Sequence, residues 1–289
     1  MSLLSTIQAV TRELGIPEPA SVVGNTDKIA KQMLALALRV GDEIVQRYTW
    51  PQLHRTATIT LAASTDSYAL PADFDRHINR THWDRTNTWE LEGPISPQEW
   101  RWRKEGIVST SPRRRYRVKG ATSTQFFVDP TPGSGEDGEI LVFEYISKSW
   151  IRPVLWESGE EFGAGSYCFY EGNYYKTTSG GTAGATPPTH TTGSASDDTV
   201  TWTYQDIAYD SFLADTDTSL IDEKVLSLGI QAAFMYQKGF QYQRTEQKFE
   251  ELLKRQATAL KGAPTLRLSS RRNPMFLTPA SIPDTITTS

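Results

Sequence analysis

The sequence has little cysteine and little histidine, no net positive charge and no long apolar run. Its single cysteine, Cys168, excludes a disulfide framework within the chain and a cysteine-rich zinc site, and it fits folding in a reducing cytoplasm. The net charge of −4, from 30 basic and 34 acidic residues, excludes a globally basic nucleic-acid binder. No run approaches the roughly 18 apolar residues of a membrane span, and the polar-interrupted N-terminus is unlike a signal sequence.

Catalytic and cofactor motifs are also missing. Of four histidines, only His77 and His82 are close, and five residues apart in one predicted strand they would point to opposite faces, which disfavours a shared metal. The glycine-rich run 179–184 lacks the Lys-Ser/Thr of a phosphate loop, and neither HExxH nor GxSxG occurs. Adjacent acids such as Glu160-Glu161 are common in acidic loops. We therefore expect no enzyme activity, no cofactor and no metal, with structural or surface roles for the histidines.

Charge is distributed unevenly along the chain. Residues 155–223 contain twelve acids and one base, Lys176, a net charge of −11. From Leu252 onward the net charge is +5. Such asymmetry suggests oriented association, in which one end of the molecule meets a complementary surface on a neighbour; the alternative is that these are only solvated faces.

Apolar periodicity predicts helices at both ends of the chain and strands between them. Helices are expected over 3–14, from a cap at Asp27 to Tyr48, after Asp222, and after Gly239 to Lys261. Period-two segments bounded by turn residues predict strands at 56–61, 67–70, 76–83, 89–93, 115–119, 125–128 and 139–146, with a short helical turn after Ser96. A hairpin over 167–175 and a strand over 200–204 flank residues 177–199, which contain no large apolar residue and are interpreted as a loop.

These elements predict an α+β fold. We expect a helical bundle formed by the N- and C-terminal helices, with an inserted β-sandwich or barrel-like domain, a small second β module and an extended C-terminal arm. The expected parts are N-terminal helices (1–51), the β domain (52–154), the acidic, aromatic-rich β module (155–205), C-terminal helices (206–262) and the arm (263–289).

The arm carries apolar anchors that it cannot bury within itself, between four prolines. We interpret it as a segment that docks on a partner, and the alternative is a disordered end without function. The residues expected to make this contact are Leu266, Arg267, Leu268, Arg271, Arg272, Met275, Phe276 and Leu277.

A basic cluster and an aromatic cluster are further candidates for binding. The basic cluster could contact phosphates or an acidic partner, or it could be a solvated strand edge in which cations discourage edge-to-edge pairing. It consists of Arg113, Arg114, Arg115 and Arg117. The aromatic cluster is either the miniature core of the acidic module or an outward platform for sugar rings, with core use the first expectation. The platform candidates are Tyr170, Tyr174, Tyr175, His190, Trp202 and Tyr204.

The order of these parts resembles a known family. Two N-terminal helices, the segment 68–75 (YALPADFD) leading to His82-Trp83, and the segment 220–223 (LIDE) followed by two helices are similar to the head-to-tail adaptor, or neck, proteins of tailed bacteriophages, especially short-tailed ones. Residues 172–202 resemble small carbohydrate-binding-like β modules of phage virion proteins, through GNYY, TPPTHT and DDTVTW. Asp198 stands where such modules usually have glycine.

The resemblance implies a structural virion protein of the neck, assembled in the host cytoplasm. Such adaptors form a ring, commonly of twelve copies, which docks beneath the phage portal protein, extends the DNA channel and supports the tail nozzle. Genomic DNA would pass through the lumen without sequence-specific binding, the helices and the arm would lie toward the portal, and the β domain would face the tail. The inserted module would sit outside the ring, where binding of a surface glycan is the alternative function and cell-wall hydrolysis is a third, less favoured one.

Overall fold

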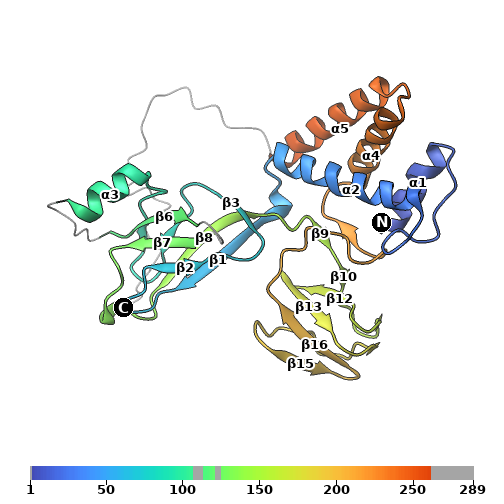
Figure 1. Cartoon of the computed structure of the whole chain (residues 1–289). Coiled ribbons are helices and arrows are strands. Elements are labelled where there is room, and N and C mark those ends of the chain that lie inside the picture. Colours follow the sequence, from blue (N-terminus) through green and yellow to red (C-terminus); the bar gives the residue numbers. More distant parts are fainter. Residues whose placement is uncertain (1, 107–112, 121–124, 262–289) are drawn as a thin grey trace, which may run out of the picture.

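The chain folds into a helical part and two β regions (Figure 1). The computed structural model describes residues 2–106, 113–120 and 125–261, so the predicted arm lies outside the described residues. The α+β class predicted from the sequence is confirmed. The helices are α1 (Leu3–Glu13), α2 (Lys28–Arg47), α3 (Pro97–Glu105), α4 (Glu223–Lys238) and α5 (Gln243–Lys261).

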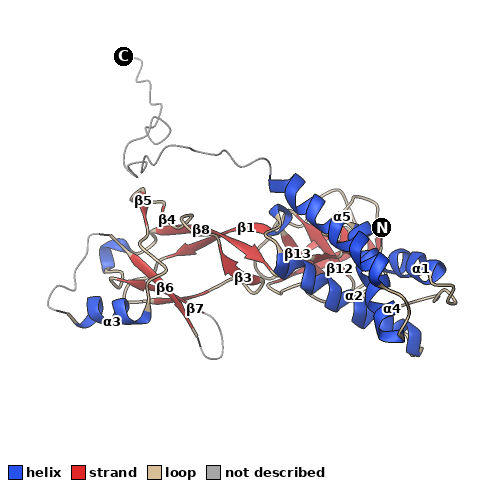
Figure 2. Cartoon of the chain, turned by 90° about the horizontal axis from the view of Figure 1, so that it is seen from above, coloured by secondary structure: helices blue, strands red, loops and turns tan. Residues whose placement is uncertain are grey.

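Helices from both ends of the chain share one core. Local signals set their boundaries: the Ser2 hydroxyl caps α1, the Asp222 carboxylate accepts two backbone N–H bonds at the start of α4, and Gly239 ends α4 with φ +74°. The apolar stripe of α2 packs against α4, while α1 and α5 also contact α4. Figure 2 shows these four helices gathered at one end of the molecule, with α3 at the other.

Trp150 joins the helical part to the end of the β domain. Its fully buried indole lies against Gly41 of α2, and its Nε1 donates a hydrogen bond to Oδ1 of Asp42 at 2.8 Å. Any side chain at residue 41 would overlap the indole ring. The sequence places a glycine within a helix here, at a cost in helix propensity, because the close approach of Trp150 requires it.

Substituting Gly41→Ala tests this contact. Alanine would gain about 1 kcal/mol of helix propensity, but overlap with Trp150 costs roughly 1–3 kcal/mol, so we expect a lower free energy of unfolding in urea titrations. Introducing Trp150→Phe together with Gly41→Ala should reduce the penalty of the alanine, because the smaller ring leaves room. An alanine variant that is more stable than the parent would contradict the contact.

The β domain places two sheets on either side of one core. One sheet has the order β1-β8-β4-β5, with β3 also paired to β8, and the other has the order β2-β7-β6. Their strands are β1 (His54–Thr60), β2 (Ser67–Ala69), β3 (Phe74–His77), β4 (Trp83–Asp84), β5 (Trp89–Glu90), β6 (Arg115–Lys119), β7 (Gln125–Asp129) and β8 (Ile140–Ser147). The buried residues between them are Ala57, Ile59, Leu61, Leu91, Tyr116, Phe126, Val128, Leu141, Phe143 and Tyr145.

The single strand predicted over 76–83 is wrong. The chain forms β3, turns, and returns as β4, and both strands pair with the same side of β8. Arg80 adopts φ +64° in the turn, a conformation that the sequence does not signal because no glycine or asparagine stands at that position.

The acidic module is built on a second sheet, with the order β10-β12-β13-β16-β15, beside the pair β11-β14. The stretch 177–199 is not only a loop, since β14 and β15 lie within it and Ala183 is buried. A further pair, β9 with β17, connects the module to the helices. The strands are β9 (Ile151–Arg152), β10 (Val154–Leu155), β11 (Glu161–Phe162), β12 (Tyr167–Tyr170), β13 (Asn173–Thr177), β14 (Gly181–Thr182), β15 (Ser194–Asp197), β16 (Val200–Gln205) and β17 (Thr218–Ser219).

Candidate functional site

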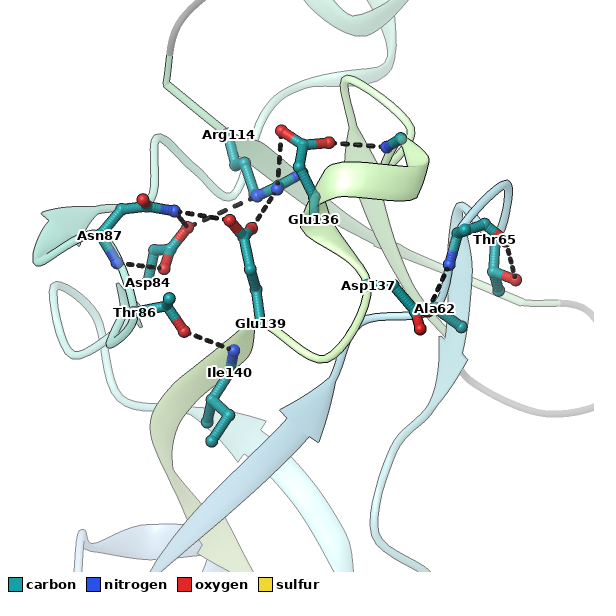
Figure 3. Close-up of polar contacts among 12 residues, drawn as sticks. Ala62, Thr65, Asp84, Thr86, Asn87, Arg114, Glu136, Asp137, Glu139 and Ile140 are labelled. Carbon is teal, nitrogen blue, oxygen red and sulfur yellow. Dashed lines mark hydrogen bonds and ion pairs between the residues drawn. The ribbon is translucent and has the colours of Figure 1, made fainter.

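The predicted basic contact patch is largely internal. Arg114 is only 6% exposed, and its guanidinium forms ion pairs with Glu139, with Glu136 at 3.1 Å and with Asp84 at 3.5 Å (Figure 3). The side chain of Asn87 completes the cluster by donating to both Asp84 and Glu139. The acids come from β4 and from the turn before β8, so a charge-rich stretch of sequence has become a buried ion cluster.

The other three arginines have different environments. Arg115 is 4% exposed and its Nε lies 2.8 Å from Oδ2 of Asp129 on the paired strand β7. Arg117 is half-buried above the ring of Trp100, at 6.0 Å, and Arg113 is exposed. For Arg114 and Arg115, both predicted roles, a contact patch and a solvated strand edge, are therefore wrong. Acids from other strands and from the turn before β8 surround these two cations and bury them.

Replacing Arg114 should affect folding rather than binding. Arg114→Met would leave Asp84 and Glu139 without their cation, a change that typically costs about 3–5 kcal/mol. We expect a correspondingly lower unfolding midpoint in urea. Arg101→Met is the matched control, because the Arg101 side chain is 72% exposed and pairs with Glu105 on the surface of α3, where ion pairs contribute little. Equal stability of the two variants would contradict the structural role of Arg114.

The predicted aromatic platform is mostly core. Trp202 and Tyr175 are fully buried and Tyr174 is 3% exposed, so these three cannot stack on a sugar from outside. The module has few aliphatic residues, and its aromatic rings supply the apolar area that folding requires. Trp202 packs edge-on to Phe162 at 4.8 Å.

The remaining platform candidates are half-buried. Tyr170 stands edge-on to Trp156, Tyr204 contacts Tyr175, and the ring of His190 lies 5.1 Å from that of Tyr175. The rings of Tyr204 and His190 thus pack on the buried Tyr175, and that of Tyr170 packs on Trp156. The proposed platform is thus corrected: core use, the first expectation, holds for Trp202, Tyr174 and Tyr175.

Cys168 lies in the same core. Burial raises the pKa of its thiol to about 12, with a further contribution from the charge of Asp197. The thiol therefore stays protonated at neutral pH, and it is a packing residue rather than a nucleophile.

His77 and His82 contact each other, contrary to the expectation that they point to opposite faces. The turn between β3 and β4 brings Nε2 of His82 to 3.1 Å from Nδ1 of His77, and Nδ1 of His82 lies 3.0 Å from the Tyr116 hydroxyl. With Tyr116 donating to His82, His82 can donate to His77, which gives a buried chain of hydrogen bonds. The imidazole of His82 also stacks on the rings of Tyr116 and Phe143.

This environment keeps His82 neutral. Burial, followed by the neighbouring His77, lowers the pKa of His82 from 6.5 to about 3, and burial also lowers the pKa of His77. Because the unfolded chain binds these protons more readily than the folded chain, stability is complete above pH 6.5 and is lost as the pH falls toward 3.

The acid sensitivity of the β domain should follow this titration. Below the ordinary histidine pKa, each such histidine lowers the free energy of unfolding by up to about 1.4 kcal/mol per pH unit. In urea titrations between about pH 7.5 and pH 5, His82→Phe should show a smaller loss of stability than the parent chain, since phenylalanine keeps the stacking and does not titrate. For each chain, the free energy of unfolding at about pH 7.5 is the reference from which its loss is measured. An unchanged slope would contradict the assignment.

The sequence did not single out the residue that joins the module to the β domain. Arg55 of β1 donates to the Gly172 carbonyl at 2.9 Å and to the Tyr174 hydroxyl at 3.1 Å, with its guanidinium 5.5 Å from the Tyr174 ring centroid. On its other side Arg55 lies 3.4 Å from Asp73, which also accepts hydrogen bonds from Tyr145 and Ser147. Asp73 belongs to the segment 68–75 (YALPADFD), which carries part of the family resemblance. That segment is the one sequence feature that pointed to this contact.

Among the described residues, no group of three or more histidine, cysteine or acidic side chains could hold a metal ion. No helix in the described part of the chain is long and apolar enough to cross a membrane. Several large side chains are instead left on the surface, where they are available to partners. These are Trp83, Trp89, Trp102, Leu155, Leu213, Tyr236, Phe240 and Leu260.

An α+β chain that leaves large aromatic side chains exposed at several places has surfaces suited to contacts with partner proteins. Comparison with protein families places it among the phage adaptors, structural proteins of the connection between head and tail. The family model of the SU10 adaptor protein matches residues 1–276, and the chain belongs to this family. No curated protein matches the chain.

Proposed function

We propose that the chain is the subunit of a ring that docks beneath the portal protein, extends the DNA channel and carries the tail. The observation that supports this proposal is the family match, which runs through the helices, both β regions and about half of the arm. Twelve copies, a short-tailed virion and contact with a tail nozzle are the finer expectations that come from the resemblance to neck proteins.

The proposed orientation follows from the placement of the parts. The helical bundle contains both ends of the described chain, and α5 leads into the arm, so we assign the helices and arm to the portal side. The β domain reaches away from the helices, as Figure 2 shows, and we assign it to the tail side. The division into two helical segments, an inserted β domain, an inserted module and an arm is part of this proposal.

We propose a structural rather than an enzymatic role. In support, Arg114, Arg115, Asp73 and His82 are held in internal contacts within the described residues, and burial keeps Cys168 protonated. The DNA would pass without sequence-specific binding, because a chain of net charge −4 offers little attraction to phosphates overall.

Deleting residues 264–289 tests the role of the arm. The deletion should abolish docking to purified portal rings, measured by co-sedimentation and by electron microscopy of the mixture, because the arm supplies the apolar and basic anchors Leu266, Arg267, Leu268, Arg271, Arg272, Met275, Phe276 and Leu277.

The deleted chain should keep its circular dichroism spectrum and unfolding midpoint close to those of the parent, which separates docking from folding. Arg101→Met in the full-length chain is a matched surface control and should dock normally. Docking that survives the deletion would overturn the role assigned to the arm.

A further inference from the structure

A groove lies between α3 and the outer face of the sheet β2-β7-β6. Its volume is about 420 Å³, and the rings of Trp100 on α3 and Phe127 on β7 form part of its lining. Phe127 alternates along β7 with the buried Phe126 and Val128, so it lies on the face of the sheet away from the core. The cations that line the groove are Arg101, Lys104, Arg117 and Lys119.

Two of these cations lie over aromatic rings instead of beside acids. The guanidinium of Arg117 is 6.0 Å from the centroid of the Trp100 ring, and the ammonium of Lys119 is 5.9 Å from that of Phe127. Neither cation has a carboxylate partner among the described residues. In the sequence, the stretch 106–128 contains five bases and no acid. The groove therefore has positive charge left to pair with an acidic occupant.

Protein carboxylates suit this groove better than the phosphates of DNA. Its rim also carries Asp66 and Glu105, which pair with Lys104 and Arg101 and would repel a phosphate backbone. Trp100 is only 8% exposed, so its ring is not open for a base to stack on it. A recess between a helix and a sheet admits side chains of a protein rather than a duplex.

The acidic module carries a matching group of exposed acids around β14. Glu160 and Glu161 pair through their backbones with residues 182–183. Asp198 lies against Gly184, the residue that follows. The three acids are exposed, and none has an ion-pair partner in the described part of the chain. One molecule thus holds an unneutralised acidic surface and an unneutralised basic groove.

The groove and the module lie on opposite sides of the β domain. Figures 1 and 2 both show α3 at the end of the β domain that is farther from the module. The acids of the module therefore do not reach the groove of their own chain. Copies arranged head to tail, each with its module against the β domain of the next, bring the two surfaces together. Contacts of this heterologous kind generate closed rings.

We propose that the groove between α3 and the sheet β2-β7-β6 binds the acidic module of a second copy of the chain. Arg117 and Lys119 of one copy then face Glu160, Glu161 and Asp198 of the next. This inference rests on the proposed ring, and it names the surfaces through which neighbouring copies meet. Because the charges are partly exposed, the attraction mainly selects which surfaces meet, and salt weakens it.

Exchanging the charges of the two surfaces tests the contact. The groove variant is Arg117→Glu/Lys119→Glu, and the module variant is Glu160→Lys/Glu161→Lys. Self-association of the isolated full chain is measured by sedimentation velocity at rising protein concentration and low salt. The parent should self-associate, and each variant alone should do so at least about tenfold more weakly, because like charges then meet. An equimolar mixture of the two variants should associate again, because the groove of one complements the module of the other.

Lys28→Glu/Lys31→Glu is the matched control. It reverses two exposed lysines of α2, makes the same change in net charge as the groove variant, and should associate like the parent. Circular dichroism and urea unfolding establish that each variant is folded. Where reversal of the half-buried Arg117 prevents folding, Lys119→Glu mixed with Glu161→Lys gives the same test, because both residues are exposed.

A parent chain that stays monomeric at every concentration would overturn the proposal, and so would a mixture that associates no better than its two components. Binding of duplex DNA by the parent that the groove variant loses would also overturn it, because phosphates would then be the occupant. No portal is present in these experiments. Co-sedimentation of the parent with portal rings tests the proposed function separately, and docking without association between copies would remove only this inference.

Discussion

The packing of Trp150 against α2 is the contact on which the arrangement of the chain depends. The indole fits against Gly41, its Nε1 bonds to Asp42, and its backbone carbonyl accepts a hydrogen bond from Leu220 at 2.9 Å. One residue thus ties an N-terminal helix, the end of the β domain and the segment that returns to the C-terminal helices. This junction therefore holds segments that are far apart in the sequence close to α2.

Two arginines and several aromatic rings that the sequence offers as binding candidates are used inside the molecule. Arg114, just before β6, and Arg115, its first residue, are surface candidates from the sequence alone, yet acids from β4, β7 and the turn before β8 bury both of them. A buried cation of this kind is held by its partners rather than by the hydrophobic effect, so it specifies which strands lie together. The module uses tyrosine and tryptophan in the same way, in place of the aliphatic residues that it lacks.

Sequence patterns predicted the helices well because their signals are local. Caps such as Asp222 and Gly239, and the apolar stripe of α2, lie within a few residues of the boundaries they set. The same reasoning failed where residues far apart in the sequence determine the environment of a side chain. The contact between His77 and His82 depends on a turn at Arg80 that lacks glycine, and the burial of Arg114 depends on Glu139, 25 residues away. The candidate site was therefore predicted less well than the fold: its residue types were found, but their partners were not.

The first half of β1 is where the parts of the chain converge. Through Arg55 it holds the acidic module, and through Asp73 that same arginine is linked to the segment before β3. A single side chain of β1 therefore links the β domain, the acidic module and the segment before β3.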